Sequence, residues 1–113
     1  MCLMDEARRI VNQMSDNIRS LFPLERPDVI LFGSYARDTA EEGSDIDVLY
    51  LVDASRQEIS DKNWQIGAAA ASLLLEHGVV VSPVVENRDY FQRNAEIFPF
   101  FRNISREGVR ISG

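Results

Sequence analysis

The sequence has little of several features, and each shortage excludes a class of protein. Its 113 residues include one cysteine, Cys2, so a fold held together by internal disulfides is excluded. The longest largely apolar run, residues 66–75, is far shorter than the ~20 residues that span a bilayer. The start of the chain becomes charged at Asp5 and lacks the pattern of a secretory signal peptide. We therefore expect a cytoplasmic protein that does not enter the membrane.

Positive charge is also scarce. The chain has 12 Lys and Arg against 18 Asp and Glu, which gives a net charge of −6. A protein that binds nucleic acid through a broad basic surface is therefore not expected. A phosphate-binding site is still compatible with this charge, because a bound cation reverses the local charge.

The chain is long enough for one hydrophobic core and shows no internal repeat. With 113 residues, 45% of them hydrophobic, we expect a single domain over residues 1–113. Apolar periodicity and the positions of Pro and Gly predict helices and strands in mixed order. The predicted helices cover residues 3–22, about 34–42, 56–77, 88–95 and 98–106, and the predicted strands cover residues 28–32, 46–52, 79–86 and 109–111. This order predicts an α/β fold with a mixed β-sheet of three to five strands and helices packed on it.

The most informative stretch is residues 29–52, in which two apolar runs flank a polar segment. The second run begins with Asp45 and Asp47, on alternate residues. Because side chains alternate between the two faces of a strand, these carboxylates are predicted to share one face. Two neighbouring carboxylates repel each other unless a cation lies between them. Mg²⁺ prefers such oxygen ligands and keeps coordination positions open for phosphate oxygens.

Gly33 and Ser34 follow directly after the first apolar run. Glycine allows the backbone to turn sharply and to approach a ligand closely. Backbone amides at the start of a following helix favour a phosphate, and the Ser34 hydroxyl can add a hydrogen bond. The stretch therefore predicts a phosphate site beside a metal site.

Gly33-Ser34, a spacer of ten residues and Asp45-Ile46-Asp47 together resemble the signature of the DNA polymerase β-like nucleotidyltransferase superfamily. The short chain is similar to its minimal nucleotidyltransferase branch, which is often paired with a HEPN protein. The resemblance implies that Gly33 and Ser34 hold a nucleoside triphosphate such as ATP. It also implies that Asp45 and Asp47 bind Mg²⁺ and are the catalytic residues. Ser44 belongs to the same motif and is included as a nucleotide-binding candidate.

Arg37 and Glu86 each have two interpretations. Arg37 either faces the phosphates, as in relatives with arginine at this position, or pairs with the acidic residues of the following loop. The family usually has a third metal-binding carboxylate on the strand after the long helix, where this chain has Ser82. Glu86 shares the strand parity of Ser82, so it is either the third ligand or a solvated glutamate at the strand end.

Pro83 and His77 are assigned structural roles. Pro83 cannot donate to a β-ladder, which predicts an edge or bulged strand. His77, the only histidine, precedes Gly78 and is assigned to the last helical turn rather than to catalysis. The aromatic patch in residues 97–104 either closes the core over the sheet or forms part of a partner surface.

Two functions follow from the resemblance. The first is Mg²⁺-dependent transfer of a nucleoside monophosphate, AMP from ATP, to a hydroxyl of a protein or small molecule. The alternative is an antitoxin-like regulatory subunit that binds a HEPN-type partner with weak or no catalysis. A homo-oligomer is compatible with either function.

Overall fold

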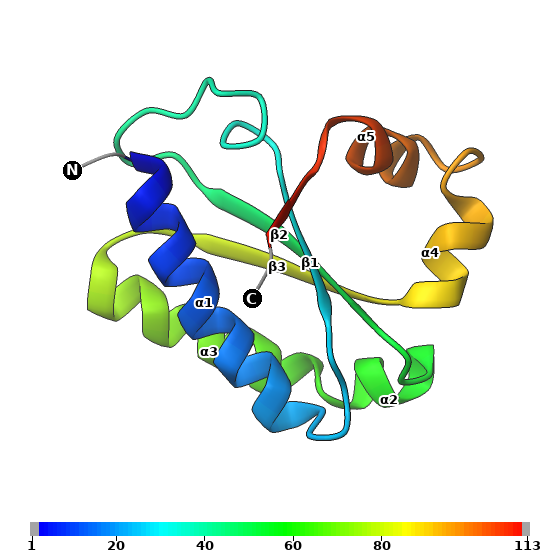
Figure 1. The fold of residues 1–113 in the computed structure, drawn as a ribbon. Helices are drawn as coiled ribbons and strands as arrows, with labels where there is room; N and C mark the ends of the chain where they lie inside the picture. The colour runs from blue at the N-terminus through cyan, green and yellow to red at the C-terminus, as the bar shows by residue number, and fades with distance from the viewer. Residues whose placement is uncertain (1–2, 112–113) are drawn as a thin grey trace.

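A mixed sheet of four strands forms the centre of the structure, a computed structural model that describes residues 3–111 (Figure 1). The strands are β1 (Asp28–Phe32), β2 (Ile46–Val52), β3 (Val81–Asn87) and β4 (Val109–Ile111). They lie in the order β3-β2-β1-β4. Strand β1 is antiparallel to β2 and β4, whereas β2 and β3 are parallel. The predicted mixed α/β sheet is therefore confirmed.

Helices cover both faces of this sheet. They are α1 (Leu3–Leu21), α2 (Arg56–Asp61), α3 (Asn63–His77), α4 (Arg88–Asn94) and α5 (Pro99–Glu107). Helices α1, α2 and α3 pack on one face, and α4 and α5 pack on the other (Figure 1). None of the helices within residues 3–111 has both the length and the apolar character needed to traverse a bilayer.

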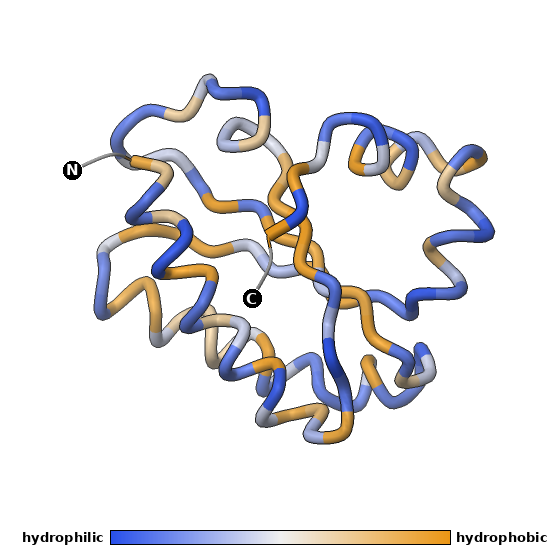
Figure 2. Tube along the Cα trace, in the orientation of Figure 1, coloured by the Kyte–Doolittle hydropathy of each residue, from blue (hydrophilic) through white to orange (hydrophobic). Residues whose placement is uncertain are grey.

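The alternation of side chains along β2 builds two apolar clusters. Val48, Tyr50 and Val52 pack with α1 and α3, whereas Leu49 and Leu51 pack with α4 and α5. The middle and end of β2 are apolar on both faces because helices cover both. One side of α1 is buried on this sheet, and polar residues occupy its other side (Figure 2).

One predicted helix is absent. The prediction of a short helix between Ser34 and Gly43 is wrong, because the structure has a series of turns there. The amides of Ala36 and Arg37 both donate to the Gly33 carbonyl, at 3.1 Å, instead of forming a continuous helical ladder. Asp38 has a φ of 58°, and this left-handed conformation ends any helix at that residue.

The predicted helix over residues 56–77 is divided in two. Lys62 lies between α2 and α3, and its amide donates to the Ile59 carbonyl at 3.0 Å. Strand β3 begins at Val81 rather than at the predicted residue 79, because α3 ends in the left-handed Gly78. The predicted edge position of Pro83 is confirmed, since β3 is the outer strand beside β2.

An ion-pair network ties the ends of three strands together, away from the motif. The Arg88 guanidinium donates to Asp28 at 2.9 Å and also pairs with Asp53. It also donates to the backbone carbonyl of Leu51 at 3.1 Å. Burial pushes the Asp28 pKa upward, but Arg88 and Arg110 outweigh it and hold this pKa below its ordinary value. These contacts join the ends of β1 and β2 to the start of α4.

Candidate functional site

Asp45 and Asp47 lie at the start of β2. Ile46 and Val48 are buried against α1 and α3, so Asp47, between them, points to the other face of the sheet. Asp45 immediately precedes the strand and is exposed, while Asp47 is half-buried. The structure therefore places the Asp47 carboxylate on the face where α4 and α5 pack, and Asp45 is near enough for its charge to act on Asp47.

Gly33 lies directly beneath the Asp47 carboxylate. Phe32, the last residue of β1, is in register with Asp47, and the chain turns away at Gly33 with a φ of 73°. A Cβ atom added at Gly33 would lie 2.3 Å from Asp47 Oδ2, well inside van der Waals contact. Only glycine fits this position, and it brings the two halves of the motif together across the β1–β2 pair.

The electrostatics of the site favour a cation. Burial raises the pKa of Asp47, the charge of Asp45 raises it further, and Arg37 lowers it. Negative charge at Asp47 is therefore incompletely compensated by the protein. The two carboxylates offer oxygen donors only, which suits Mg²⁺. Within residues 3–111, no three His, Cys, Asp or Glu side chains gather into a complete metal site, so a substrate would have to supply further oxygens.

Arg37 belongs to the turn that follows Gly33. Its guanidinium lies 3.6 Å from the Glu107 carboxylate, at the end of α5, and its charge acts on Asp47. The ion pair therefore bridges to a distant helix rather than to the acidic residues of its own loop. About half of each of these two side chains is exposed, so the Arg37 guanidinium remains accessible to a ligand.

The hydroxyl of Ser44 closes a turn. It accepts a hydrogen bond from the Glu41 amide at 2.8 Å, and the Ser44 amide donates to the Glu41 carbonyl at 3.0 Å. These bonds shape the loop that delivers the chain to Asp45. Its contacts are structural, and its assignment as a nucleotide-binding residue remains a prediction.

The structure separates Glu86 from the two aspartates. Ser82 is in register with Asp47, whereas Glu86 is in register with Leu51, four residues or about 13 Å along the strand. Glu86 is buried, and its carboxylate accepts hydrogen bonds from Arg56 at 3.2 Å and from the Asn87 amide at 2.8 Å. The interpretation of Glu86 as a solvated residue at the strand end is therefore wrong.

The aromatic residues of α5 partly adjoin the site, which sequence reasoning did not predict. Phe32 shares the face of Asp47, and the Phe100 ring packs edge-on against Phe32 with centroids 5.7 Å apart. Phe101 is buried, whereas Phe98 and Phe100 are 39% and 49% exposed. The patch therefore closes the core and also leaves an aromatic surface. No local pattern marks this pairing, because the two rings are 68 positions apart in the chain.

His77 has the structural position that was predicted. It ends α3, and its Nε2 lies 2.6 Å from Gln13 Oε1 of α1. The contact joins the two helices on the sheet face opposite Asp47.

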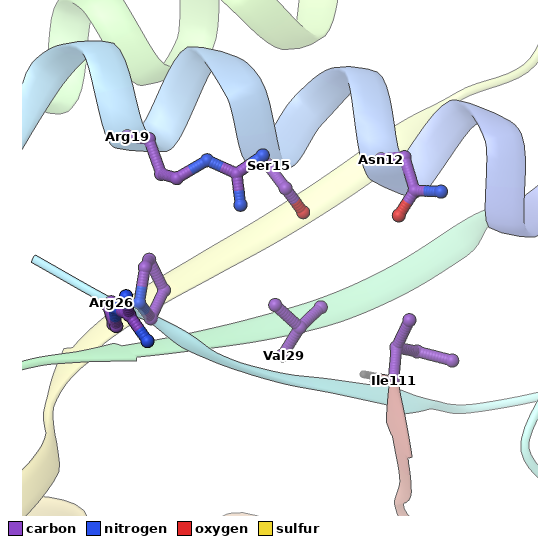
Figure 3. A pocket seen from close by; sticks show the side chains of 7 residues that line it. Asn12, Ser15, Arg19, Arg26, Val29 and Ile111 are labelled. Carbon is purple, nitrogen blue, oxygen red and sulfur yellow. The ribbon is translucent and has the colours of Figure 1, made fainter. Parts of the chain in front are cut away.

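A cavity of about 550 Å³ lies on that same opposite face, between α1 and the β1–β4 edge (Figure 3). Its lining residues are Asn12, Ser15, Arg19, Arg26, Pro27, Val29 and Ile111. None of the motif residues lines it, so this cavity is separate from the candidate site.

Known proteins resemble this chain in sequence and in fold. The family model described as a nucleotidyltransferase domain matches residues 11–107. A Methanocaldococcus jannaschii protein named, provisionally, protein adenylyltransferase MJ0604 is 31% identical over 100 residues, which cover 88% of this chain and 92% of the relative. MJ0141 of the same organism, named in the same way, is 32% identical over 80 residues, covering 71% of this chain and 79% of its own length.

A solved structure described as a toxin–antitoxin with AMP-PNP has a similar fold. Its TM-score is 0.56 with 22% sequence identity, and the match covers 90% of this chain and 72% of that chain. At this identity the likeness concerns the fold.

Proposed function

Because the chain belongs to the nucleotidyltransferase domain family, we propose that it transfers AMP from ATP to a hydroxyl group of a protein. The hydroxyl oxygen forms a bond to the α-phosphorus, the bond from that phosphorus to the bridging oxygen of pyrophosphate breaks, and the hydroxyl proton is released. Support for a protein acceptor comes from the relatives, which are provisionally named protein adenylyltransferases. The single cysteine and the use of ATP fit a reaction in the cytoplasm.

The observation that carries the proposal is the position of Asp47 over Gly33. The turn after Gly33 would bind the β- and γ-phosphates, with help from the Ser34 hydroxyl and the Arg37 guanidinium. Asp45 and Asp47 would hold Mg²⁺, consistent with the raised pKa of Asp47 beside Asp45. Mg²⁺ would neutralise charge on the phosphates and align them for in-line displacement.

Ser82 offers a direct test of the proposed metal site. It is in register with Asp47, in the position where the resemblance implies a third carboxylate. Ser82→Asp would add a negative charge beside two others, so we expect lower thermal stability without metal. With Mg²⁺ and ATP the same variant should bind more tightly than the wild type. Ser82→Asn is the matched uncharged control and should show neither effect.

The first experiment is calorimetric titration of ATP, with and without Mg²⁺. We expect Mg²⁺-dependent binding by the wild type and its loss in Asp45→Asn/Asp47→Asn. Transfer is then followed as label from ATP, labelled at the α-phosphate, that becomes attached to protein. If the folded wild type binds no ATP in the presence of Mg²⁺, the proposed site is incompetent in the isolated chain.

A second candidate function is that of a regulatory, antitoxin-like subunit of a HEPN-type partner. Two observations favour it: the fold shared with a solved toxin–antitoxin, and the exposed apolar side chains Ile97, Phe98 and Phe100 before and within α5. Asp45→Asn separates the two functions. Control of the partner that survives this substitution indicates simple binding, whereas loss of control with the fold intact indicates catalysis.

A further inference from the structure

The sheet face that carries Asp47 is only partly covered by helices. On this face Leu49 and Leu51 of β2 are buried, because α4 and α5 pack on them. Asp47, two residues before Leu49 on the same strand, is half-buried. Its neighbours across the sheet, Phe32 on β1 and Ser82 on β3, are half-buried as well. The helices therefore leave this last row of the sheet partly open to a ligand.

Helix α5 borders the open row at two points. The Phe100 ring packs edge-on against the Phe32 ring, with centroids 5.7 Å apart. Glu107, the last residue of the helix, lies 3.6 Å from the Arg37 guanidinium in the turn after Gly33. Phe100 and Glu107 are seven residues apart, which is nearly two helical turns, so they lie on the same side of α5. That side of α5 faces the motif.

We infer that the base of the nucleotide stacks on the Phe100 ring. In the proposed function, on which this assignment rests, the triphosphate lies on the turn after Gly33 and Mg²⁺ lies at Asp47. Phe32 is the cross-strand neighbour of Asp47, and side chains in that relation lie about 5 Å apart. Phe100 adjoins Phe32, so its ring is one side chain away from the metal position. A base joined to the α-phosphate through a ribose reaches that ring.

The direction of the reaction separates the nucleotide from the acceptor. In-line displacement requires the acceptor hydroxyl and the leaving pyrophosphate on opposite sides of the α-phosphorus. The turn proposed to hold the β- and γ-phosphates follows β1, whereas β3 lies on the other side of β2. The acceptor therefore approaches over Ser82 of β3. Phe32 and Phe100 lie on the side of β1, so they contact the nucleotide rather than the acceptor.

Stacking on a phenyl ring also defines the class of base. Such a ring selects a base by the area that stacks, and not by hydrogen bonds to the edges of the base. Phe100 is 49% exposed although its ring also contacts Phe101, with centroids 6.1 Å apart, so part of the ring is available to a ligand. Purines have a larger flat surface than pyrimidines. The site should therefore prefer ATP and GTP over UTP and CTP.

The test compares ligands with and without a base, by calorimetric titration of the full chain in Mg²⁺. ATP and inorganic tripolyphosphate both carry a triphosphate, but only ATP carries a base. Phe100→Leu keeps an apolar side chain and removes the ring. It should weaken ATP binding by about fivefold to thirtyfold and leave tripolyphosphate binding unchanged. Phe100→Trp, which restores a flat ring, should bind ATP at least as tightly as the wild type.

Trp64→Leu is the control for the loss of an aromatic ring elsewhere. Trp64 is 82% exposed and belongs to α3, on the sheet face opposite Asp47. This variant should bind ATP like the wild type. The preference of the wild type for ATP over UTP should persist in Trp64→Leu and shrink in Phe100→Leu.

The two ligands distinguish failure of the base contact from failure of the proposed function. If Asp45→Asn/Asp47→Asn loses both ligands while Phe100→Leu binds both normally, the phosphate site stands and the base contact is refuted. Normal ATP binding by Phe100→Leu with reduced transfer to protein would assign Phe100 to the acceptor instead. Equal weakening of ATP and tripolyphosphate by Phe100→Leu would also refute stacking, because only ATP has a base. A wild type that binds neither ligand would overturn both proposals.

Discussion

Replacement of Gly33 by alanine tests the geometry of the proposed site most directly. The first cost is in the backbone, because Gly33 has a φ of 73° and an L-residue in this left-handed region costs about 1–2 kcal/mol. For a chain of this size that corresponds to a fall in Tm of several degrees, at roughly 4–8 °C per kcal/mol.

The second cost of Gly33→Ala falls on the Asp47 carboxylate. The new Cβ would meet Asp47 Oδ2 at 2.3 Å, so the carboxylate must retreat by about 1 Å to reach ordinary contact. A displacement of about 1 Å at a reacting centre can lower activity by roughly a hundredfold. We therefore expect a modest loss of stability and a much larger loss of Mg²⁺-dependent ATP binding and transfer.

Gly43→Ala is the matched control for this prediction. Gly43 also has a left-handed φ, of 86°, but an added Cβ would meet nothing within 4 Å. Thermal unfolding should therefore show a similar Tm loss in both variants without ligand. Stabilisation by ATP with Mg²⁺ should persist only in Gly43→Ala. Equal ligand stabilisation of the two variants would refute the argument that Asp47 must keep its position over Gly33.

Three further predictions concern charge and burial. Asp47→Asn should raise the Tm at neutral pH, since burial raises the folded-state pKa of Asp47 and its ionised form is disfavoured. The gain should shrink as pH falls through that pKa in thermal scans, and a loss of stability at neutral pH would contradict the reasoning. Asp28 has a lowered pKa beside Arg88, so its contribution is present above its unfolded pKa and is lost as pH falls through the folded value. Asp28→Asn should therefore flatten the acid limb of the stability profile, and an unchanged limb would argue against this ion pair. Tyr50→Phe should cost about 0.5–1.5 kcal/mol in urea unfolding, because the buried hydroxyl donates to the Val11 carbonyl at 3.1 Å, and a neutral result would mean that the bond adds nothing.

Much of the fold could be predicted because local patterns agree with the tertiary structure. Strands β1 and β2 match their predicted bounds, since continuous apolar runs flank the motif and the core covers both faces of β2. The turn after Gly33 could not be predicted. Its residues mix good and weak helix formers, and hydrogen bonds to the Gly33 carbonyl and the left-handed Asp38 select turns instead.

Side-chain environments depended on contacts that sequence spacing does not encode. Glu86 was interpreted as a solvated residue or a metal ligand, yet Arg56 and the Asn87 amide hold it in a buried position. The pairing of Arg37 with Glu107 joins a loop to a helix 70 residues later. The Arg56–Glu86 and Arg37–Glu107 pairs both depend on how α2 and α5 dock on the sheet.

The sequence by itself determined the mixed α/β class, the position of Asp47 in a strand beside the first apolar strand, and a sharp turn at Gly33. These follow from short-range rules, namely the two-residue period of a strand and the left-handed freedom of glycine. Only the tertiary structure decided that Ser82 rather than Glu86 lies beside Asp47, and that Trp64 and Leu75 of α3 are exposed. Strand register and helix docking are set by the packing of the whole core, so residues far apart in the chain decide them together.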